Sequence, residues 1–483
     1  MQLFLINYDT HYEIEQLTRM FFRNLTLIKS AELPKETETD FIIIEKIGDD
    51  FTLNITFNGK KLSDSVTIDK NGAKEEMQLC IGAYNLYKSA TGTSLPWGVL
   101  TGVRPVRLMR NLNKKLGSEE KAVEKFKNDY LVSEEKIKLC RDIFTLQKPV
   151  IESGNPMDYS LYISIPFCPS RCSYCSFVST SIKNTGHLMG AYVDNLCKEI
   201  VYTAKKADEL GLNLKTIYIG GGTPTAVTAK MLEQIMVTVK DCFDLSKILE
   251  YTVEAGRPDC TDIEKLMIIK KYGANRVSIN PQTFSDNVLK AIGRNHTSED
   301  FIRCVADARK VGFDSINMDL IAGLPEDTVE GFEKSLRGCI ELGAENITVH
   351  TLTMKRASNL VIKNEEHEYA DVEQMIAKNA ILNDYGYKPY YMYRQKSTVK
   401  NLENVGFSQV GHESLYNIYI MEEIQTIISC GAGGVSKVVG PNGELKRVYN
   451  YKYPNEYIKD FDAILARKDE VFSIWQQFGF QKD

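Results

Sequence analysis

The segment Leu161–Phe177 constrains this chain most, because it places three cysteines directly after a strand-like run. It reads LYISIPFCPSRCSYCSF. The apolar and β-branched residues before Pro166 predict a strand that ends at the proline. Cys168, Cys172 and Cys175 follow with the spacing C-x3-C-x2-C. Three thiolates so close in sequence converge on one point only if the backbone wraps around a bound group, and thiolates are the soft ligands of iron–sulfur clusters and zinc.

The number of ligands alone does not decide between a zinc ion and an iron–sulfur cluster. A structural zinc site takes four protein ligands, and no fourth cysteine stands at zinc-ribbon spacing, although His187 could complete a Cys3His set. A 4Fe–4S cluster held by three cysteines leaves one iron open to a substrate or cofactor. We therefore expect the cluster.

The cysteine segment resembles the radical S-adenosylmethionine (SAM) superfamily, in which an aromatic residue, here Tyr174, precedes the last cysteine. The stretch YISIPFC from Tyr162 to Cys168 is similar to the branch of oxygen-independent coproporphyrinogen III oxidases and their haem-related relatives. The resemblance implies a 4Fe–4S cluster on Cys168, Cys172 and Cys175, with SAM as the second cofactor. Tyr162 matches a family tyrosine near SAM, or is a buried aromatic residue of the first strand.

Composition excludes several classes of protein. A chain of 483 residues predicts two or three domains. The net charge of −5 carries no basic excess, so we expect no nucleic-acid partner. No apolar run reaches the roughly 18 to 20 residues of a membrane span, and the first residues do not form a signal peptide. Outside the triplet, the cysteines are typical of small buried hydrophobes, which indicates a reducing cytoplasm.

From Leu161 onward, strand and helix patterns alternate. The predicted strands are Leu161–Ile165, Thr216–Ile219, Tyr251–Glu254, Arg276–Ile279, Ser315–Leu320 and Asn346–Thr351. The predicted helices between them are Leu188–Leu210, Ala229–Phe243, Ile263–Tyr272, Ser298–Val311 and Val329–Leu342. Six such repeats require crossover connections and a parallel sheet, which a barrel or a doubly wound sheet could provide. Chemistry at successive strand ends favours the barrel, and the resemblance implies a partial (β/α)6 TIM-like barrel.

We predict three domains on this basis: an N-terminal α/β domain with a docking segment at 1–155, the barrel at 156–360, and a C-terminal α+β extension toward the substrate at 361–483. The N-terminal pattern predicts four strands and two helices: Leu3–Ile6, Phe41–Glu45, Phe51–Phe57, Lys61–Ile68, Glu13–Phe22 and Glu75–Ala90. After the barrel, the pattern predicts a helix at Tyr369–Tyr385 and a tyrosine-rich strand at Tyr387–Arg394. Truncation at about residue 150 would test whether the first domain serves turnover.

Polar and glycine residues follow the predicted strands. The second strand runs into Gly221, Gly222 and Thr223, where glycine lets the backbone approach a ligand closely. This loop resembles the family motif that holds the amino end of SAM. Glu254 ends the third strand, and is either structural, paired with Arg257, or the family glutamate that contacts SAM.

Three further residues match the family at the next strand ends. Gln282 matches a family glutamine, and Arg294 matches an arginine whose bidentate guanidinium suits the SAM carboxylate. Asp319 matches the aspartate that accepts hydrogen bonds from the ribose hydroxyls of SAM. Ordered matches at successive strand ends together predict a SAM site.

The resemblance implies reductive cleavage of SAM by an electron from a flavodoxin- or ferredoxin-like donor. The resulting radical would abstract a hydrogen from each of two propionates of coproporphyrinogen III, and loss of CO2 would give protoporphyrinogen IX. The protein would thus belong to haem biosynthesis as a coproporphyrinogen dehydrogenase.

Departures from the family keep two alternatives open. Phe177 stands where the prototype oxidases have a further cysteine, and the C-x-Y-C-x-F pattern is shared with haem-trafficking relatives. Those relatives carry a His-Asn-x-x-Tyr-Trp motif, and here Tyr416 replaces its histidine. The alternatives are a haem-binding or trafficking protein, with His412 as axial ligand, and a radical SAM enzyme that transfers a methyl group to haem and opens its ring.

A tetrapyrrole with several carboxylates should meet basic residues. The candidates by chemistry alone are Arg104, Arg107, Lys355, Arg356 and Arg394.

Overall fold

A computed structural model describes residues 1–22, 24–30, 40–102, 104–175, 179–353, 371–395 and 398–479. The chain forms two compact units. Unit 1 comprises Met1–Phe144 with Arg394–Lys396 and Lys400–Leu402, and unit 2 comprises Thr145–Tyr393, Ser397–Val399 and Glu403–Asp483. The division into 1–155, 156–360 and 361–483 stays a prediction.

Unit 1 begins with a five-stranded sheet in the order β2-β1-β3-β4-β5. Its strands are β1 (Gln2–Ile6), β2 (Thr26–Ser30), β3 (Phe41–Ile47), β4 (Asp50–Phe57) and β5 (Lys60–Val66). β1 pairs in parallel with β2 and β3, and β3, β4 and β5 form antiparallel hairpins. The four predicted strands are present, and β2 is an additional strand.

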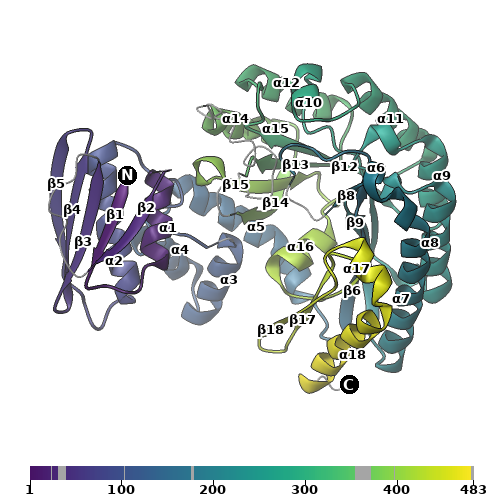
Figure 1. Cartoon of the computed structure of the whole chain (residues 1–483), viewed down its shortest axis with the longest axis horizontal. Coiled ribbons are helices and arrows are strands. Elements are labelled where there is room, and N and C mark those ends of the chain that lie inside the picture. The colour runs from purple at the N-terminus through teal and green to yellow at the C-terminus, as the bar shows by residue number, and fades with distance from the viewer. Residues whose placement is uncertain are drawn as a thin grey trace. The chain divides into compact units, whose positions relative to one another are not determined.

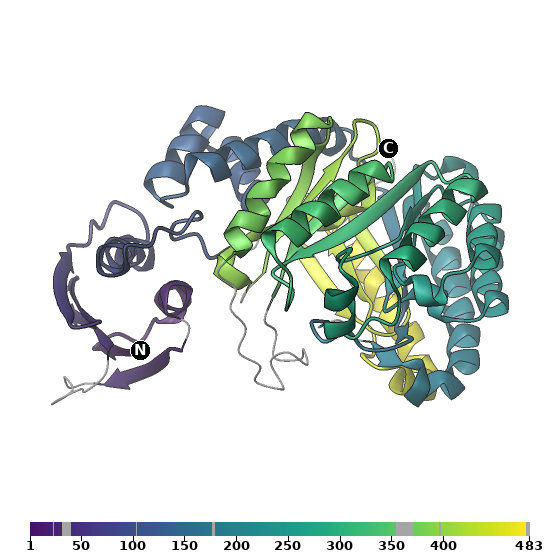
Figure 2. The ribbon, with the colours of Figure 1, turned by 90° about the horizontal axis from the view of Figure 1, so that it is seen from above.

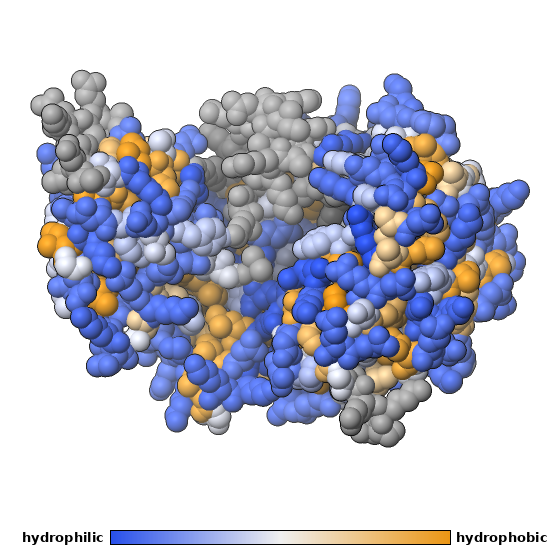
Figure 3. Space-filling view, turned by 60° about the horizontal axis from the view of Figure 1, so that its bottom comes forward, coloured by the Kyte–Doolittle hydropathy of each residue, from blue (hydrophilic) through white to orange (hydrophobic). Residues whose placement is uncertain are grey.

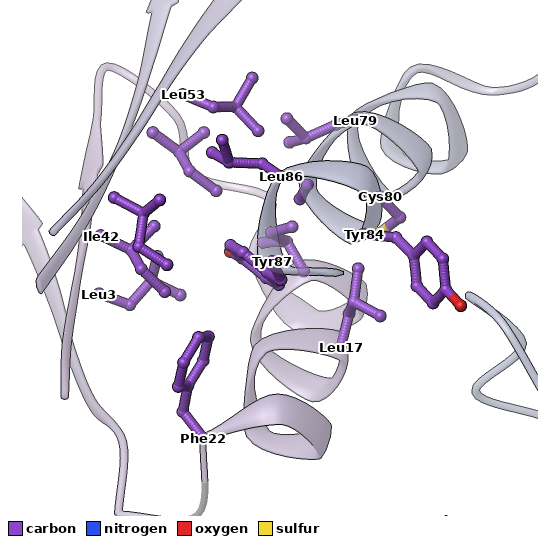
Figure 4. Packing of buried hydrophobic residues seen from close by; sticks show 14 of the residues in the cluster. Leu3, Leu17, Phe22, Ile42, Leu53, Leu79, Cys80, Tyr84, Leu86 and Tyr87 are labelled. Carbon is purple, nitrogen blue, oxygen red and sulfur yellow. The ribbon is translucent and has the colours of Figure 1, made fainter. Parts of the chain in front are cut away.

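Two helices cover this sheet: α1 (Tyr12–Phe21) and α2 (Glu75–Thr91). Figure 4 shows Leu17 of α1 and Leu79, Leu86 and Tyr87 of α2 facing the apolar side chains of the strands. Burial of such side chains supplies the main favourable free energy of a small α/β unit. Three more helices follow, α3 (Pro105–Leu116), α4 (Glu119–Asn128) and α5 (Glu134–Glu152), and the last extends into unit 2.

The segment before α3 is packed inside unit 1. Trp97 is fully buried, and the backbone N–H of Val99 donates to the carbonyl of Tyr130. Gly98 has a positive φ of 52°, and a Cβ there would lie 2.1 Å from the Tyr130 oxygen, so only glycine fits. These contacts hold the segment within unit 1, and its predicted docking on the next domain stays a prediction.

Unit 2 is built on an eleven-stranded sheet in the order β14-β15-β13-β12-β11-β10-β9-β6-β16-β17-β18. Its central strands are β6 (Asp158–Ile165), β9 (Asn213–Gly221), β10 (Glu250–Glu254), β11 (Arg276–Ser278), β12 (Ser315–Ala322) and β13 (Asn346–Thr351). Each pairs in parallel with the next. The six predicted strands and their parallel pairing are therefore confirmed.

The crossover helices are α7 (Met189–Glu209), α8 (Ala229–Cys242), α9 (Ile263–Lys271), α11 (Ser298–Val311) and α12 (Val329–Glu341). Figure 1 and Figure 2 show these helices on the outer side of the parallel strands, as in a partial barrel. The short α10 (Asp286–Ala291) precedes α11. The five predicted helices are confirmed, each within two residues at either end.

The C-terminal part of the chain adds strands to both edges of the sheet. β16 (Thr426–Cys430) lies parallel to β6, which makes it a seventh parallel strand that the sequence pattern did not predict. β17 (Val435–Val439) and β18 (Leu445–Tyr449) extend this end antiparallel. At the other end lie β14 (Lys388–Arg394) and β15 (Glu403–Ser408).

The remaining helices are α14 (Val372–Ala377), α15 (Ile381–Asp384), α16 (Leu415–Glu422), α17 (Pro454–Lys459) and α18 (Phe461–Gln477). The helix predicted at Tyr369–Tyr385 is broken by a 3-10 turn at Lys378–Ala380, and its first residues lie outside the described ones. α18 packs through Val471, Phe472 and Trp475 into a core with Tyr159 of β6 and Ile428 of β16.

Hydrophilic residues cover much of the face seen in Figure 3, with apolar residues scattered among them. Among the described residues, no helix is both long and apolar enough to cross a membrane.

Candidate functional site: a cysteine loop at the mouth of the barrel

The cysteine loop begins where β6 ends. Phe167–Cys168 form a short strand, β7, that pairs with β8 (Thr180–Ser181). The backbone N–H of Ser173 donates to the carbonyl of Ile292 at 3.0 Å, which holds the loop against the segment after α10. Of the three cysteines, Cys172 is buried, and Cys168 and Cys175 are half-buried.

Hydrogen-bond donors face two of the three sulfurs. The hydroxyl of Thr223 donates to Cys168 Sγ at 3.5 Å, and Nη1 of Arg257 lies 3.5 Å from Cys172 Sγ. Burial raises the pKa of the Cys168 thiol, and the Thr223 hydrogen bond opposes that rise. Donors of this kind stabilise sulfur ligands that carry negative charge.

The glycine loop after β9 lies directly against the cysteine loop. The N–H of Gly222 donates to the carbonyl of Ile165, and the N–H of Thr223 donates to that of Phe167, both at 2.8 Å. A Cβ on Gly222 would lie 2.7 Å from the Phe167 oxygen and 2.9 Å from Cys168 Sγ. Gly221 has a φ of +115°, and a Cβ there would lie 2.9 Å from the Ile165 nitrogen and 3.0 Å from its oxygen. These glycines thus lie close to the end of β6 and to the cysteine loop, and their contact with SAM stays a prediction.

Glu254 does not pair with Arg257, so the ion pair considered for it is wrong. Its Oε1 accepts a 2.6 Å hydrogen bond from the hydroxyl of Tyr218, and Arg257 instead pairs with Asp259. Burial raises the pKa of Glu254 to about 7, with a further contribution from the charge of Asp319. Glu254 therefore changes its protonation state near neutral pH.

Tyr174 and Arg294, predicted separately, are brought together. Nη2 of Arg294 donates to the Tyr174 hydroxyl at 3.3 Å, and Nη1 donates to the carbonyls of Asn280 and Gly256 at 2.7 and 3.3 Å. Arg294 Nε is buried and has no hydrogen-bond partner within the described part of the chain. A buried cationic donor without a partner is the kind of group that binds a carboxylate.

Asp319 lies within β12, and Gln282 follows β11 and bridges to Leu320 of β12. The N–H of Gln282 donates to the Asp319 carbonyl at 2.9 Å, and Gln282 has a φ of +67°, a conformation that is uncommon for residues other than glycine. Asn317 donates to Asp319 Oδ1 at 2.8 Å, and His350 Nε2 lies 3.7 Å from Oδ2. Burial alone would raise the pKa of Asp319, but the contacts with His350, Asn317 and Thr348 lower it overall, so Asp319 is an ionised acceptor at neutral pH.

Tyr162 belongs to a stack of three tyrosines. Its ring centroid lies 6.1 Å from that of Tyr218 and 6.2 Å from that of Tyr416, and Tyr218 and Tyr416 stack at 4.5 Å. Burial raises the pKa of all three hydroxyls, so the stack stays neutral. Tyr218, Tyr416 and His350 were not predicted as site residues, although His350 ends a strand like the residues that were.

The donor set was also tested against a metal ion. Across the described ranges, no group of three or more His, Cys, Asp or Glu side chains is arranged to hold a metal ion, and this includes the Cys3His set with His187. The cluster on Cys168, Cys172 and Cys175 therefore stays a prediction, supported by the donors that face Cys168 and Cys172. Phe177 lies outside the described residues.

Two other sequence candidates have structural contacts. The His412 carbonyl accepts hydrogen bonds from Arg276 Nη1 at 2.8 Å and Asn346 Nδ2 at 2.6 Å, which anchors the turn before α16. Arg394 is 3% exposed, donates to the carbonyls of Leu100 and Gly102, and lies over the Trp97 ring within unit 1. These contacts argue against substrate binding by Arg394. Lys355 and Arg356 lie outside the described residues.

Comparison with known proteins identifies the family. The profile of the radical SAM superfamily matches residues 162–338. The oxygen-independent coproporphyrinogen-III oxidase-like protein HemZ of Bacillus subtilis is 36% identical over 477 residues, which cover 95% of this chain and 94% of that protein. The chain belongs to the radical SAM superfamily.

Two other groups of radical SAM relatives are similar. The heme chaperone HemW of Bacillus subtilis is 38% identical over 215 residues, 43% of this chain and 55% of that protein. HemW of Escherichia coli is 29% identical over 307 residues, 62% of this chain and 75% of that protein. The solved structure of the radical SAM enzyme coproporphyrinogen III oxidase (HemN) from Escherichia coli matches with a TM-score of 0.50 and 22% identity, over 67% of this chain and 73% of that one. The last match confirms the fold.

The radical SAM family uses a 4Fe–4S cluster and SAM, so the cofactor prediction is confirmed at the level of the family. The chain's own residues fit both groups: three thiols on one loop, two of them facing donors, and a buried arginine whose Nε has no partner among the described residues.

Proposed function

We propose that the protein is a radical SAM oxidoreductase that converts two propionates of coproporphyrinogen III into vinyl groups and so forms protoporphyrinogen IX in haem biosynthesis. The observation that carries the proposal is the meeting of the cysteine loop and the glycine loop with Glu254, Arg294 and Asp319 at one side of the barrel. The similarity to HemZ over 95% of the chain supports the same class of substrate.

Each predicted residue has a role in this proposal. Cys168, Cys172 and Cys175 hold the cluster, and Tyr174, Gly221, Gly222, Thr223, Glu254, Gln282, Arg294 and Asp319 hold SAM. Arg294 Nε would donate to the SAM carboxylate, and Asp319 would accept from its ribose hydroxyls. When bound, the cluster and SAM supply a 5′-deoxyadenosyl radical, with methionine as the other product.

The substrate reaction balances if each propionate gives one β-hydrogen atom to the 5′-deoxyadenosyl radical, releases one CO2 and passes one electron to an external one-electron acceptor. The stacked rings of Tyr162, Tyr218 and Tyr416, whose hydroxyls stay neutral, would give this radical chemistry an uncharged aromatic wall. A flavodoxin- or ferredoxin-like protein would supply the electron that cleaves SAM. We place the reaction in the cytoplasm, where thiols stay reduced.

A haem chaperone is the second candidate, because relatives of that name match up to 66% of the chain. The structure offers a reason to rank it lower. Tyr416 stands at the position of the chaperones' motif histidine, is 4% exposed, and stacks on Tyr218, so it offers no imidazole to haem iron.

The test is anaerobic turnover followed by liquid chromatography–mass spectrometry. Reconstituted protein receives SAM, dithionite and either coproporphyrinogen III or haem, with C172S as the matched control. Protoporphyrinogen with about two deoxyadenosines per product would support the proposal. Haem retained without deoxyadenosine would favour the chaperone, and a methylated linear tetrapyrrole would favour methyl transfer with ring opening.

A further inference from the structure

Arg257 is a buried arginine that the predicted SAM site does not use. It follows β10 by three residues and is 3% exposed. Its Nε and Nη2 donate to the two carboxylate oxygens of Asp259 at 2.8 and 2.6 Å. This bidentate pair fixes the plane of the guanidinium.

The other edge of the same guanidinium faces the cysteine loop. Nη1 lies 3.5 Å from Cys172 Sγ and 3.5 Å from the Ser170 carbonyl, and Nη2 donates to the Ser170 hydroxyl at 3.1 Å. One planar group therefore joins Asp259 to both the backbone and a sulfur of the loop. A lysine could not make all of these contacts, because its ammonium is a single point of charge.

The guanidinium stays charged in this buried place. Arginine keeps its charge in proteins, and the bidentate pair with Asp259 stabilises the charged form here. Hydrogen bonds and positive charge beside a cysteine sulfur stabilise the more negative, reduced state of an iron–sulfur cluster.

We propose that Arg257 is a positioning residue for the cluster, and that its guanidinium, donating to Cys172 Sγ, makes the bound cluster easier to reduce. Asp259 orients the guanidinium and, as a countercharge, limits the effect. The proposal rests on the proposed function in one respect: Cys172 must be a cluster ligand.

The experiment is a redox titration of the anaerobically reconstituted full chain, followed by electron paramagnetic resonance without substrate. We expect R257Q to shift the midpoint potential to a more negative value, and R257K to fall between R257Q and wild type. The matched control is R337Q on α12, which removes an exposed arginine paired with Glu333 at 2.8 Å and should leave the potential unchanged. An R257Q protein with a full cluster and the wild-type potential overturns the proposal.

A second variant decides the question if R257Q takes up no cluster. D259N keeps the guanidinium beside Cys172 and removes its countercharge, so the potential should become more positive. An unchanged or more negative potential in D259N overturns the proposal. The outcomes also separate the two proposals: wild type without a 4Fe–4S cluster, or C172S with as much iron and sulfide as wild type, refutes the cysteine ligands, whereas a loaded wild type with unshifted variants refutes only the role of Arg257.

Discussion

Glu254 is the residue in the site whose charge depends most on its surroundings. It is enclosed by Tyr218, whose hydroxyl donates to it, and by the ionised Asp319 on β12. Its pKa of about 7 in the folded chain stands above the usual glutamate value of about 4.3. Between these two pH values the folded chain binds one proton that the unfolded chain has lost.

The sign of the pH dependence follows from this difference. Where the folded state binds more protons, the free energy of unfolding falls as pH rises. We expect E254Q to match the wild type near pH 4.5 and to gain up to about 3 kcal/mol over it by pH 8. Urea unfolding of the cluster-free protein from pH 4.5 to 8 measures the difference. If the stability difference between E254Q and wild type does not grow with pH, this account is contradicted. Y218F removes a hydrogen bond that lowers the pKa of Glu254, so in Y218F the pH range over which stability falls should shift upward.

Gly222 leaves no room for a side chain. Because a Cβ would lie 2.7 Å from the Phe167 carbonyl oxygen and 2.9 Å from Cys168 Sγ, G222A must displace the cysteine loop. We expect the variant to lose most of its capacity to bind iron and sulfide on anaerobic reconstitution, with SAM binding weakened as well. In the control G190A on α7, the nearest atom to the new Cβ lies 3.9 Å away, so wild-type loading is expected. If G222A and G190A bind equal amounts of iron and sulfide, the close contact between Gly222 and the cysteine loop does not matter for cluster binding.

Some residues of the site could be predicted from local sequence patterns, and others could not. The cysteine spacing, the glycine run and the polar residues after Val253 and Met318 lie at strand ends, so a correct strand assignment also placed them at one mouth. Their individual roles stay predictions. The contact of Arg257 with Cys172 spans 85 residues, and the stacking of Tyr416 on Tyr218 joins distant segments, so neither leaves a periodic signal.

At the scale of elements, α16 is held by a buried carboxylate. Glu250 is 3% exposed, and it accepts from the Ser414 hydroxyl at 2.8 Å and from the Leu415 N–H at 2.6 Å. A negative charge at a helix N-terminus satisfies unpaired N–H groups and complements the helix dipole. Since α16 carries Tyr416, this carboxylate also places the third ring of the stack.

E250Q should loosen α16 without unfolding the barrel. We expect a cost of about 1–2 kcal/mol, seen as roughly 5- to 30-fold faster hydrogen exchange of the α16 amides by mass spectrometry. S118A removes a comparable capping hydrogen bond from α4 and serves as the control, because it should speed exchange in α4 alone. Unchanged exchange in α16 would show that Glu250 does not hold the helix.

Strands and helices that alternate regularly along the sequence were predicted well, and elements outside this alternation were not. Strong apolar strands followed by amphipathic crossovers gave the six strands and five helices between Asp158 and Thr351. β16 was missed because the helix before it, α16, has only 8 residues, and because its partner β6 lies more than 260 residues earlier. Pairing at such separation is set by tertiary packing rather than by local propensity.

At the scale of the whole molecule, the barrel unit is tied together by a buried ion pair. Lys468 of α18 lies 2.9 Å from Glu199 of α7, and the two side chains are 1% and 0% exposed. Glu199 also accepts from the Gly431 N–H at 2.7 Å and the Tyr457 hydroxyl at 2.6 Å. One carboxylate thus joins α7, the turn after β16, α17 and α18.

K468M should destabilise the unit by about 3–5 kcal/mol, because it leaves a buried carboxylate without its cation. The double variant E199Q/K468M should cost less than the sum of the single changes, since the stranded charge is gone. Urea unfolding in a W97F background, where Trp475 of α18 is the remaining tryptophan, reports the transition. K206M breaks an exposed pair between the same two helices, 3.7 Å from Asp469, and should cost less than about 1 kcal/mol. If K468M and K206M lower the free energy of unfolding equally, the buried pair stabilises the unit no more than the exposed pair.

The pairing of β6 with β16 also determines when the parallel sheet can be completed during synthesis. β6 ends at Ile165, and the strand that completes its second edge ends at Cys430. At a synthesis rate of about 5–20 residues per second, the nascent chain holds its three thiols on an unfinished sheet for roughly a quarter of a minute to a minute. If the three thiols hold a cluster, as proposed, iron and sulfide can meet a completed parallel sheet only after Cys430 has been made.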